Sequence, residues 1–174
     1  MEKFMENSDR KKELFTNAMS NLMKDKLGVS IDLLNELINT DSEDKLAFLA
    51  RGSVYLKMKN TKNAIADFNR VIEIDANHPK AYHLRGLAHE MAGDNDEAIL
   101  DFNRAIDIDG EYGAAFYSRA SLLTKMGQEN SALEDMKMVN HLSNLNIENF
   151  ANENNVWRSR QLQLEEAMES EMHR

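Results

Sequence analysis

The sequence contains no cysteine, one proline and only seven glycines among its 174 residues. Without cysteine the chain can form neither a disulfide nor a thiolate metal site. So few turn-forming residues exclude a sandwich or barrel of many short strands. No apolar run approaches the roughly 18 residues that a membrane-spanning helix needs, and Met1 to Glu6 lack the apolar stretch of a secretory signal. We therefore expect a soluble, mostly helical, cytoplasmic chain.

Acidic residues outnumber basic ones by 30 to 21, and the formal net charge is −9. Nucleic-acid phosphates would be repelled by such a surface unless it carried a local basic stripe. Lys57, Lys59 and Lys62 cluster near one turn, but their surroundings are acidic. We expect no nucleic-acid partner and no membrane insertion.

A repeat of 34 residues dominates the sequence. Asp67-Phe68-Asn69-Arg70 returns as Asp101-Phe102-Asn103-Arg104, and the same shift aligns four consecutive units without a gap. The units are residues 11–44, 45–78, 79–112 and 113–146. They leave an N-terminal extension, 1–10, and a C-terminal segment, 147–174.

Each unit has the pattern of two amphipathic helices, because large and small apolar residues recur at fixed positions. The fourth is large (Leu14, Phe48, Tyr82, Phe116) and the eighth is small (Ala18, Gly52, Gly86, Ala120). The twentieth is small (Ser30, Ala64, Ala98, Ala132) and the twenty-fourth is large (Leu34, Phe68, Phe102, Met136). Steps of three and four residues place such positions on one helical face. Small residues let two backbones approach while large ones fill the space beside them. The predicted helices are 11–24, 29–40, 44–58, 61–74, 79–92, 95–108, 113–126 and 129–142.

This large–small–small–large unit resembles the tetratricopeptide repeat, a helix–turn–helix of 34 residues. The resemblance implies an all-α fold, a right-handed superhelical solenoid of four repeats. The usual proline at the thirty-second position is missing, and the turn glycine is present only as Gly93 and Gly127. In the tail, apolar residues recur at steps of three and four, which predicts a C-terminal capping helix over 147–174. They are Phe150, Trp157, Leu164 and Met168, with Asn154 and Gln161 on the same face. We expect Phe150 and Trp157 to cover the last repeat.

Arginine and aspartate occur together at the seventh and twenty-third positions of three units and are both absent from the first. The pairs are Arg51 with Asp67, Arg85 with Asp101, and Arg119 with Asp135. A planar guanidinium suits a carboxylate. We interpret them as structural ion pairs between helices. A ladder of arginines that binds anionic ligands is the alternative.

No catalytic motif is recognisable. The sequence has no phosphate-binding Gly-rich loop, no Gly-x-Ser-x-Gly elbow and no cysteine nucleophile. His83 and His89 are six residues apart, so they point to different sides of their predicted helix. We expect His89 to be a satisfied core histidine. We expect no enzyme activity, no cofactor and no metal site.

The resemblance also implies a concave groove lined by the first helices, in which ligand peptides commonly lie. The positions that face this groove in the family give a set of candidate residues. They are Phe15, Met19, Leu22, Leu46, Leu49, Ser53, Leu56, Lys80, His83, Leu87, Glu90, Tyr117 and Ser121. The first two units contribute mostly apolar residues, and contiguous exposed apolar surface marks interaction sites. We therefore expect a protein–protein interaction module or adaptor that binds a peptide or helix of a partner protein.

Two alternatives stay open. In the first, the protein is a self-associating assembly scaffold, a possible homo-oligomer whose groove is covered by residues 1–10 or by a second subunit. In the second, it is a co-chaperone that clamps the acidic tail of a heat-shock chaperone with Lys, Asn, Asn, Lys and Arg. Counted from the 45–78 unit, the corresponding residues are Leu49, Ser53, Leu84, Ala114 and Ser118, and none matches. Counted from the 11–44 unit they are Phe15, Met19, Ala50, Lys80 and Leu84, with one match.

Overall fold

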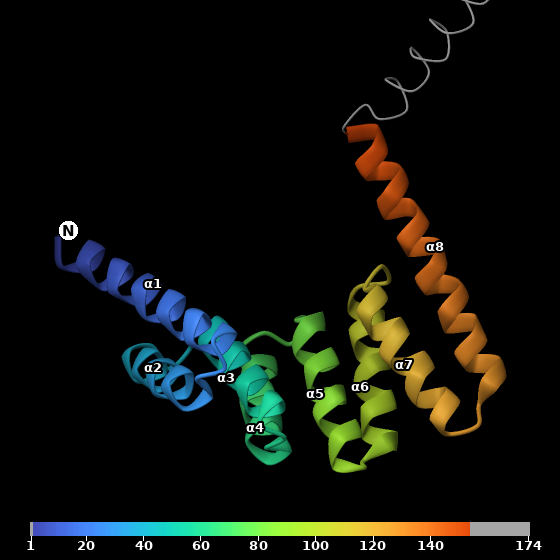
Figure 1. Cartoon of the computed structure of the whole chain (residues 1–174), viewed down its shortest axis with the longest axis horizontal. Helices are drawn as coiled ribbons and strands as arrows, with labels where there is room; N and C mark the ends of the chain where they lie inside the picture. Colours follow the sequence, from blue (N-terminus) through green and yellow to red (C-terminus); the bar gives the residue numbers. More distant parts are fainter. Residues whose placement is uncertain (1, 154–174) are drawn as a thin grey trace, which may run out of the picture.

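The computed structural model describes the backbone of residues 2–153 and the side chains of residues 9–146. Within this range the chain consists of helices joined by short turns, which confirms the all-α prediction (Figure 1). The helices are α1 (Glu2–Met23), α2 (Leu27–Thr40), α3 (Lys45–Lys57), α4 (Thr61–Ile74), α5 (Pro79–Ala92), α6 (Asn95–Ile108), α7 (Gly113–Lys125) and α8 (Glu129–Glu153).

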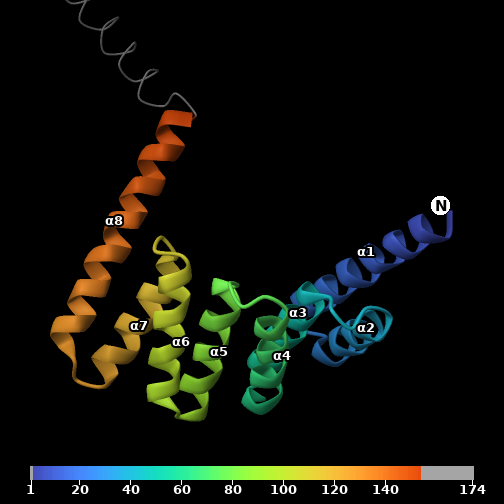
Figure 2. The same ribbon diagram turned by 180° about the vertical axis from the view of Figure 1, so that it is seen from behind.

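The helices form a solenoid of four antiparallel pairs. Each helix packs against the next one along the chain, and the first helices of successive pairs, α1, α3, α5 and α7, also contact one another. Within residues 2–153 the second helices of the pairs make no such mutual contacts. Because the first helices approach one another and the second ones spread apart, the first helices line the inner side of the curved stack (Figures 1 and 2).

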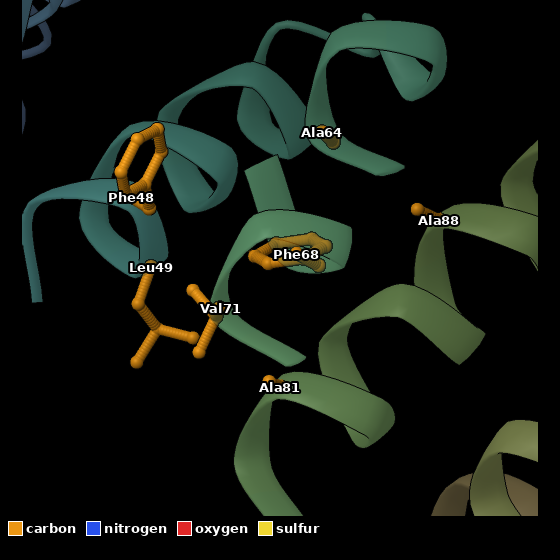
Figure 3. Close-up of a cluster of buried hydrophobic side chains, with 7 residues drawn as sticks. All are labelled: Phe48, Leu49, Ala64, Phe68, Val71, Ala81 and Ala88. Carbon is orange, nitrogen blue, oxygen red and sulfur yellow. The ribbon is translucent and has the colours of Figure 1, made fainter. Parts of the chain in front are cut away.

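The hydrophobic core continues from one pair into the next. Phe68 of α4 is fully buried, and Figure 3 shows it between α3 and α5. The same cluster contains Phe48, Leu49, Ala64, Val71, Ala81 and Ala88. A unit therefore completes its core only when its neighbour is present, as expected for a repeat array.

The turn inside each pair requires a left-handed backbone at one position. Asp25 and Lys59 have φ of 59°, while Gly93 and Gly127 have φ of 92° and 75°. These four residues are equivalent in the repeat. Glycine adopts this conformation without steric cost, so the first two turns carry strain that the last two avoid.

The turn between pairs is closed by an aspartate. Asp41, Asp75 and Asp109 each accept a hydrogen bond from the backbone N–H two residues on, at 3.1, 3.2 and 3.0 Å. This local bond replaces helical ones and ends the helix. Lys11 and Lys45 also donate to Asp41 and Asp75, at 2.7 and 2.8 Å. These side-chain bonds are the main reason that the pKa of each of the two carboxyls is lowered.

Both ends of the array differ from the predicted boundaries. Helix α1 begins at Glu2, so residues 2–10 of the N-terminal extension continue the first helix beyond its predicted start at residue 11. No proline or glycine occurs before residue 28 to interrupt it.

Helix α8 is continuous to Glu153, so the predicted interruption between residues 142 and 147 is wrong. No glycine or proline follows Gly127, and the turn aspartate is replaced by Ser143. The Ser143 hydroxyl donates to the Val139 carbonyl at 2.9 Å, a bond made within the helix. The side chain of Phe150 and the whole of residues 154–174, including Trp157, Leu164 and Met168, lie outside the described residues. Their role as a cap stays a prediction.

Candidate functional site

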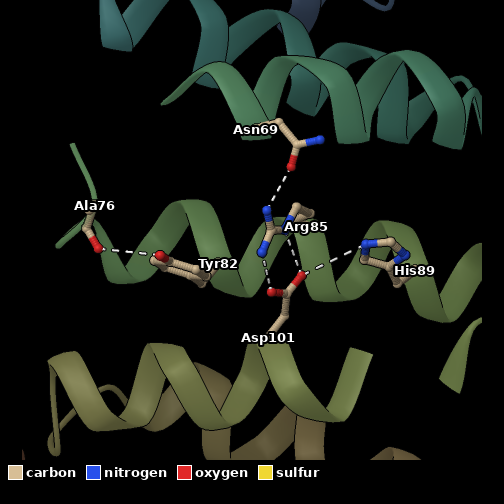
Figure 4. A network of polar contacts seen from close by, with 6 residues as sticks. All are labelled: Asn69, Ala76, Tyr82, Arg85, His89 and Asp101. Carbon is tan, nitrogen blue, oxygen red and sulfur yellow. Dashed lines mark hydrogen bonds and ion pairs between the residues drawn. The ribbon is translucent and has the colours of Figure 1, made fainter. Parts of the chain in front are cut away.

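Three arginines hold the pairs in register. Arg85 donates from Nε and Nη2 to the two carboxylate oxygens of Asp101, at 2.8 and 2.6 Å. Its Nη1 donates to Asn69 Oδ1 of the preceding pair at 2.6 Å (Figure 4). The same three bonds join Arg51 to Asp67 and Asn35, and Arg119 to Asp135 and Asn103.

These arginines serve the scaffold. The three aspartates are buried, and the hydrogen bonds that Arg51 and Arg85 donate to Asp67 and Asp101 are the main cause of the raised pKa of these two arginines. Each guanidinium is engaged along both edges and lies over an aromatic ring, as Arg85 does over Tyr82 at 5.3 Å. The asparagine partners were not predicted. The recurrence of Asn35, Asn69 and Asn103 at the repeat interval was the signal that could have found them.

In the second and third units, the residue at the fifth position does not face the groove as predicted. Leu49 and His83 are buried, and Phe15 is half-buried. His83 Nε2 lies 2.9 Å from Ser118 Oγ, and its Nδ1 lies 3.3 Å from the Tyr112 hydroxyl. This position is therefore filled by contact with the next unit.

Burial makes His83 a neutral structural residue. Its desolvation, with a smaller contribution from the positive charge of Lys80, lowers its pKa to about 4. Tyr112, its partner, has a raised pKa for the same main reason, burial. The prediction that His83 lines the groove is wrong, because its ring is enclosed by the third and fourth units.

His89 is not the satisfied core histidine that the sequence predicted. Its Nδ1 is buried and makes no hydrogen bond to any described residue. It lies 3.6 Å from Asp94, and Nε2 lies 4.0 Å from Asp101. Arg85 already occupies Asp101, so the imidazole has no well-aligned acceptor (Figure 4).

Three of the predicted groove residues converge on one hollow. Leu56 of α3 and Leu87 and Glu90 of α5, together with Met91 and Lys125, line a concavity of about 470 Å³. Lys125 of α7 donates to Glu90 at 2.6 Å across its edge. We call this surface the inner hollow. Its floor is apolar and its rim carries one ion pair.

The first unit contributes less open surface than its sequence suggests. Met19 and Leu22 are half-buried against a small core of Ala18, Leu34 and Val54. Phe15 and the exposed Leu46 line a smaller hollow of about 230 Å³ between α1 and α3.

The remaining candidates are dispersed. Lys80 is exposed, and the half-buried Ser53 donates its hydroxyl to the Leu49 carbonyl at 2.8 Å. Tyr117 and Ser121 lie far along the stack on α7, where they line a separate hollow with Met136.

Two further kinds of feature would point to another class of site: a membrane-spanning helix and a metal centre. Residues 2–153 hold no helix with the length and apolar character to cross a bilayer. Among the side chains of residues 9–146, no three histidine or acidic groups gather as metal ligands would.

Comparison with known proteins is consistent with this geometry. A family description for the TPR repeat matches residues 52–93, and one for the tetratricopeptide repeat matches residues 79–112. No curated protein matches the sequence.

Solved structures share the fold at low sequence identity. The crystal structure of MamA is 18% identical with a TM-score of 0.72, and the match covers 84% of this chain and 86% of that one. MamA from Desulfovibrio magneticus RS-1 is 19% identical with a TM-score of 0.70, over 77% and 76% of the two chains. The first TPR of Spaghetti (RPAP3), bound to HSP90 peptide SRMEEVD, is 20% identical with a TM-score of 0.65, over 69% and 95%. The two repeat matches cover residues 52–112, and together with the 34-residue period and the paired-helix solenoid they identify tetratricopeptide repeats within this chain.

Proposed function

We propose that the protein is a non-catalytic interaction module, an adaptor or scaffold that binds a segment of a partner protein on its concave side. The observation that carries the proposal is the inner hollow. Three successive first helices, α3, α5 and α7, contribute to it, although they are far apart in sequence. A segment lying there would contact three repeats at once.

The chemistry of the inner hollow favours an apolar anchor with charged neighbours. Leu56, Leu87 and Met91 offer apolar contact, and methionine adapts to the shape of what it binds. Glu90 and Lys125 at the rim offer one acceptor and one donor to polar groups of the segment. This combination suits an amphipathic helix or an extended hydrophobic peptide.

Peptide binding by a similar fold supports the mode but not the ligand. The first TPR of Spaghetti (RPAP3) was solved with the HSP90 peptide SRMEEVD. In this chain the corresponding clamp positions from the 45–78 unit are not basic, and Leu49 among them is buried. An acidic chaperone tail is therefore disfavoured in comparison with an apolar segment.

Self-association is the second candidate. Leu46 is 61% exposed beside the small hollow that Phe15 lines, so another copy could bury this surface. Light scattering over a wide range of protein concentration separates the two candidates. A mass that stays at that of one chain favours partner binding, and a mass that rises favours self-assembly.

The test of partner binding uses peptides selected from a random display library on the wild-type protein. Met91→Asp places a carboxylate in the inner hollow and should weaken the selected peptides at least about 10-fold. Leu100→Asp is the matched control, because Leu100 is 66% exposed on α6, outside the inner hollow. Equal loss in both variants, or no loss in either, would contradict the proposal.

A further inference from the structure

The last unit leaves one face of the array uncovered. Within residues 2–153, α8 packs against α7 alone, whereas α2, α4 and α6 each lie between two first helices. Met136 is 42% exposed, although the equivalent Phe68 and Phe102 are fully buried, and Tyr117 is 59% exposed. We call the surface formed by Tyr117, Met136 and Lys137 the end face. Tyr117 and Met136 line a hollow of about 420 Å³ there.

The first unit leaves the opposite face uncovered. Glu13, Thr16 and Asn17 are exposed on α1, and we call these three residues the start face. In the later units the residues at the same positions are buried or half-buried, because the preceding unit packs against them. The array therefore presents two different ends.

One contact recurs at every joint, between the fifth position of a unit and the sixth position of the next. His83 Nε2 at the fifth position lies 2.9 Å from Ser118 Oγ at the sixth. At the two earlier joints the equivalent residues share a core cluster, Phe15 with Ala50 and Leu49 with Leu84. At the ends of the array these positions hold Tyr117 and Thr16, which are both exposed. A second copy placed as the next unit would bring its Thr16 beside Tyr117.

The second recurring contact is a hydrogen bond, and the two ends carry it with donor and acceptor exchanged. Asn69 at the twenty-fifth position accepts from Arg85 at the seventh position of the next unit, at 2.6 Å. The last unit has Lys137 at the twenty-fifth position, and the first unit has Asn17 at the seventh. An ammonium donates and an amide oxygen accepts, so these two residues can still bond. Glu13 lies one turn before Asn17 on the same face of α1 and adds a carboxylate opposite the ammonium.

The helices at the two ends overhang the array by similar lengths. The first helices α3, α5 and α7 begin with their units, but α1 begins at Glu2 and adds residues 2–10, about 14 Å at about 1.5 Å per residue. The second helices end at the thirtieth position, but α8 continues past Leu142 and adds residues 143–153, about 16 Å. Because the helices of a pair are antiparallel, both overhangs project past the same edge of the array (Figure 1). In a second copy placed as the next unit, α1 would run antiparallel to α8 along this extra length.

We propose that the end face of one copy binds the start face of a second copy, so that the solenoid continues head to tail from chain to chain. Lys137 then lies beside Asn17 and Glu13 of the second copy, and Tyr117 lies beside its Thr16. Because the start face is polar, this joint buries less apolar surface than an internal joint, and it is reversible. The contact joins two different surfaces, so it does not close on itself and assembly continues beyond a dimer.

This assembly goes beyond the proposed function and does not depend on it. The inner hollow is formed by α3, α5 and α7 on the concave side, so joined copies leave it open. Pairing of two end faces is disfavoured, because it would bring two Lys137 ammonium groups together.

Thiol cross-linking tests the placement, because the chain has no native cysteine. Full-length Tyr117→Cys and Thr16→Cys proteins of different mass labels are mixed and treated with a short thiol-specific cross-linker. The expected product is a dimer that contains one chain of each kind. Tyr117→Cys mixed with Lys62→Cys is the matched control, since Lys62 is exposed on α4, inside the array, and should give only a background yield.

Three results of this experiment would overturn the proposal. Cross-linking of Tyr117→Cys to itself, with Thr16→Cys unreactive, would join two end faces. Equal yields in the mixture and the control would show random encounter only. No product in either sample at high concentration would leave the end face to residues 147–174, the cap that the sequence predicts, or to another protein.

An exchange of charges tests the pairing of Lys137 with Glu13. In sedimentation equilibrium the average mass of the wild type should rise with concentration and exceed that of two chains. Lys137→Glu and Glu13→Lys should each weaken association at least about 5-fold, because like charges then meet across the joint. Mixed together, the two variants offer each other opposite charges, so the mass should rise again. Lys62→Glu is the control and should associate like the wild type.

The exchange also separates this assembly from the other modes of action. A wild type that stays at the mass of one chain, or a mixture no larger than its components, would contradict the proposal. A rise in mass that persists in both charge variants but is lost in Leu46→Asp would assign self-association to the small hollow instead, with the same consequence. A rise that both variants reduce and the mixture restores belongs to the two ends, and the binding of a partner segment is then decided by the peptide measurement with Met91→Asp alone.

Discussion

Gly52 and Phe68 lie so close together that a β-carbon on Gly52 would fall 2.6 Å from Phe68 Cε1. The pair of Gly86 and Phe102 repeats the relationship at 2.7 Å. Where the eighth position is alanine instead, as in the first and last units, the facing residue is Leu34 or Met136. An aromatic ring at the twenty-fourth position therefore goes with glycine at the eighth.

Gly52→Ala should destabilise the protein by about 1–3 kcal/mol, because the new methyl group overlaps a ring that has no free space. Phe68→Leu reproduces the first unit's pairing, so the double variant should lose less than the two single changes added together. Urea unfolding of the four proteins measures the coupling. A coupling energy of zero would show that the ring moves aside freely.

Lys59→Gly should stabilise the protein by about 1 kcal/mol. Lys59 has φ of 59°, a conformation that costs a side-chain-bearing residue about 1–2 kcal/mol and glycine almost nothing. Lys62→Gly is the control within α4, where glycine costs about 1 kcal/mol instead. Thermal melting of both variants shows the sign. A lower melting temperature for Lys59→Gly would contradict the strain at this turn.

Because of His83, the protein should be less stable in mild acid than at neutral pH. Its folded pKa of about 4 lies below its ordinary value of 6.5, so the unfolded chain binds the proton more readily. The His83 contribution to stability is full above pH 6.5 and is lost as the pH falls toward 4. NMR titration of the ring reports the pKa directly. In His83→Leu, which takes the residue of the second unit, the fall in melting temperature over this range should be smaller. An ordinary pKa near 6.5 would show that the ring is solvated.

The peptide SRMEEVD should show no measurable binding. Its carboxylates would find only Lys80 as a basic residue at the five positions counted from the first unit, and none at those counted from the second. Fluorescence anisotropy of a labelled peptide is the measurement, with Lys80→Ala as the comparison. Micromolar binding by the wild type that disappears in Lys80→Ala would contradict this prediction.

The helices were predictable because their determinants are local. Small and large residues recur at steps of three and four, and this pattern places α4, α5 and α6 at residues 61–74, 79–92 and 95–108 as observed. The first three units have an aspartate at the turn that ends the second helix, and the last unit has Ser143 there instead. This replacement lets α8 continue, but it was not recognised in the sequence as a signal.

The surface was harder to predict because exposure depends on the neighbouring unit. Leu49, His83 and Tyr117 occupy the same position in successive units, but only Tyr117 is exposed. A groove variant based on sequence alone would have chosen Leu49→Asp, which places a carboxylate in the core. Met91, which sequence analysis did not name, is the better probe because it is exposed and lines the inner hollow.

The bonds of Arg51, Arg85 and Arg119 have a consequence for how the array comes apart. Each guanidinium uses an aspartate of its own pair and an asparagine of the pair before it, so opening one joint strips a partner from a buried charge. The free energy needed to separate two adjacent helix pairs therefore rises relative to the free energy needed to unfold the complete array. The first unit has Asn17 in place of the arginine, and only its Asn35 takes part in this chain of bonds. Protection from hydrogen exchange should accordingly be weakest in α1 and nearly uniform from α3 to α7.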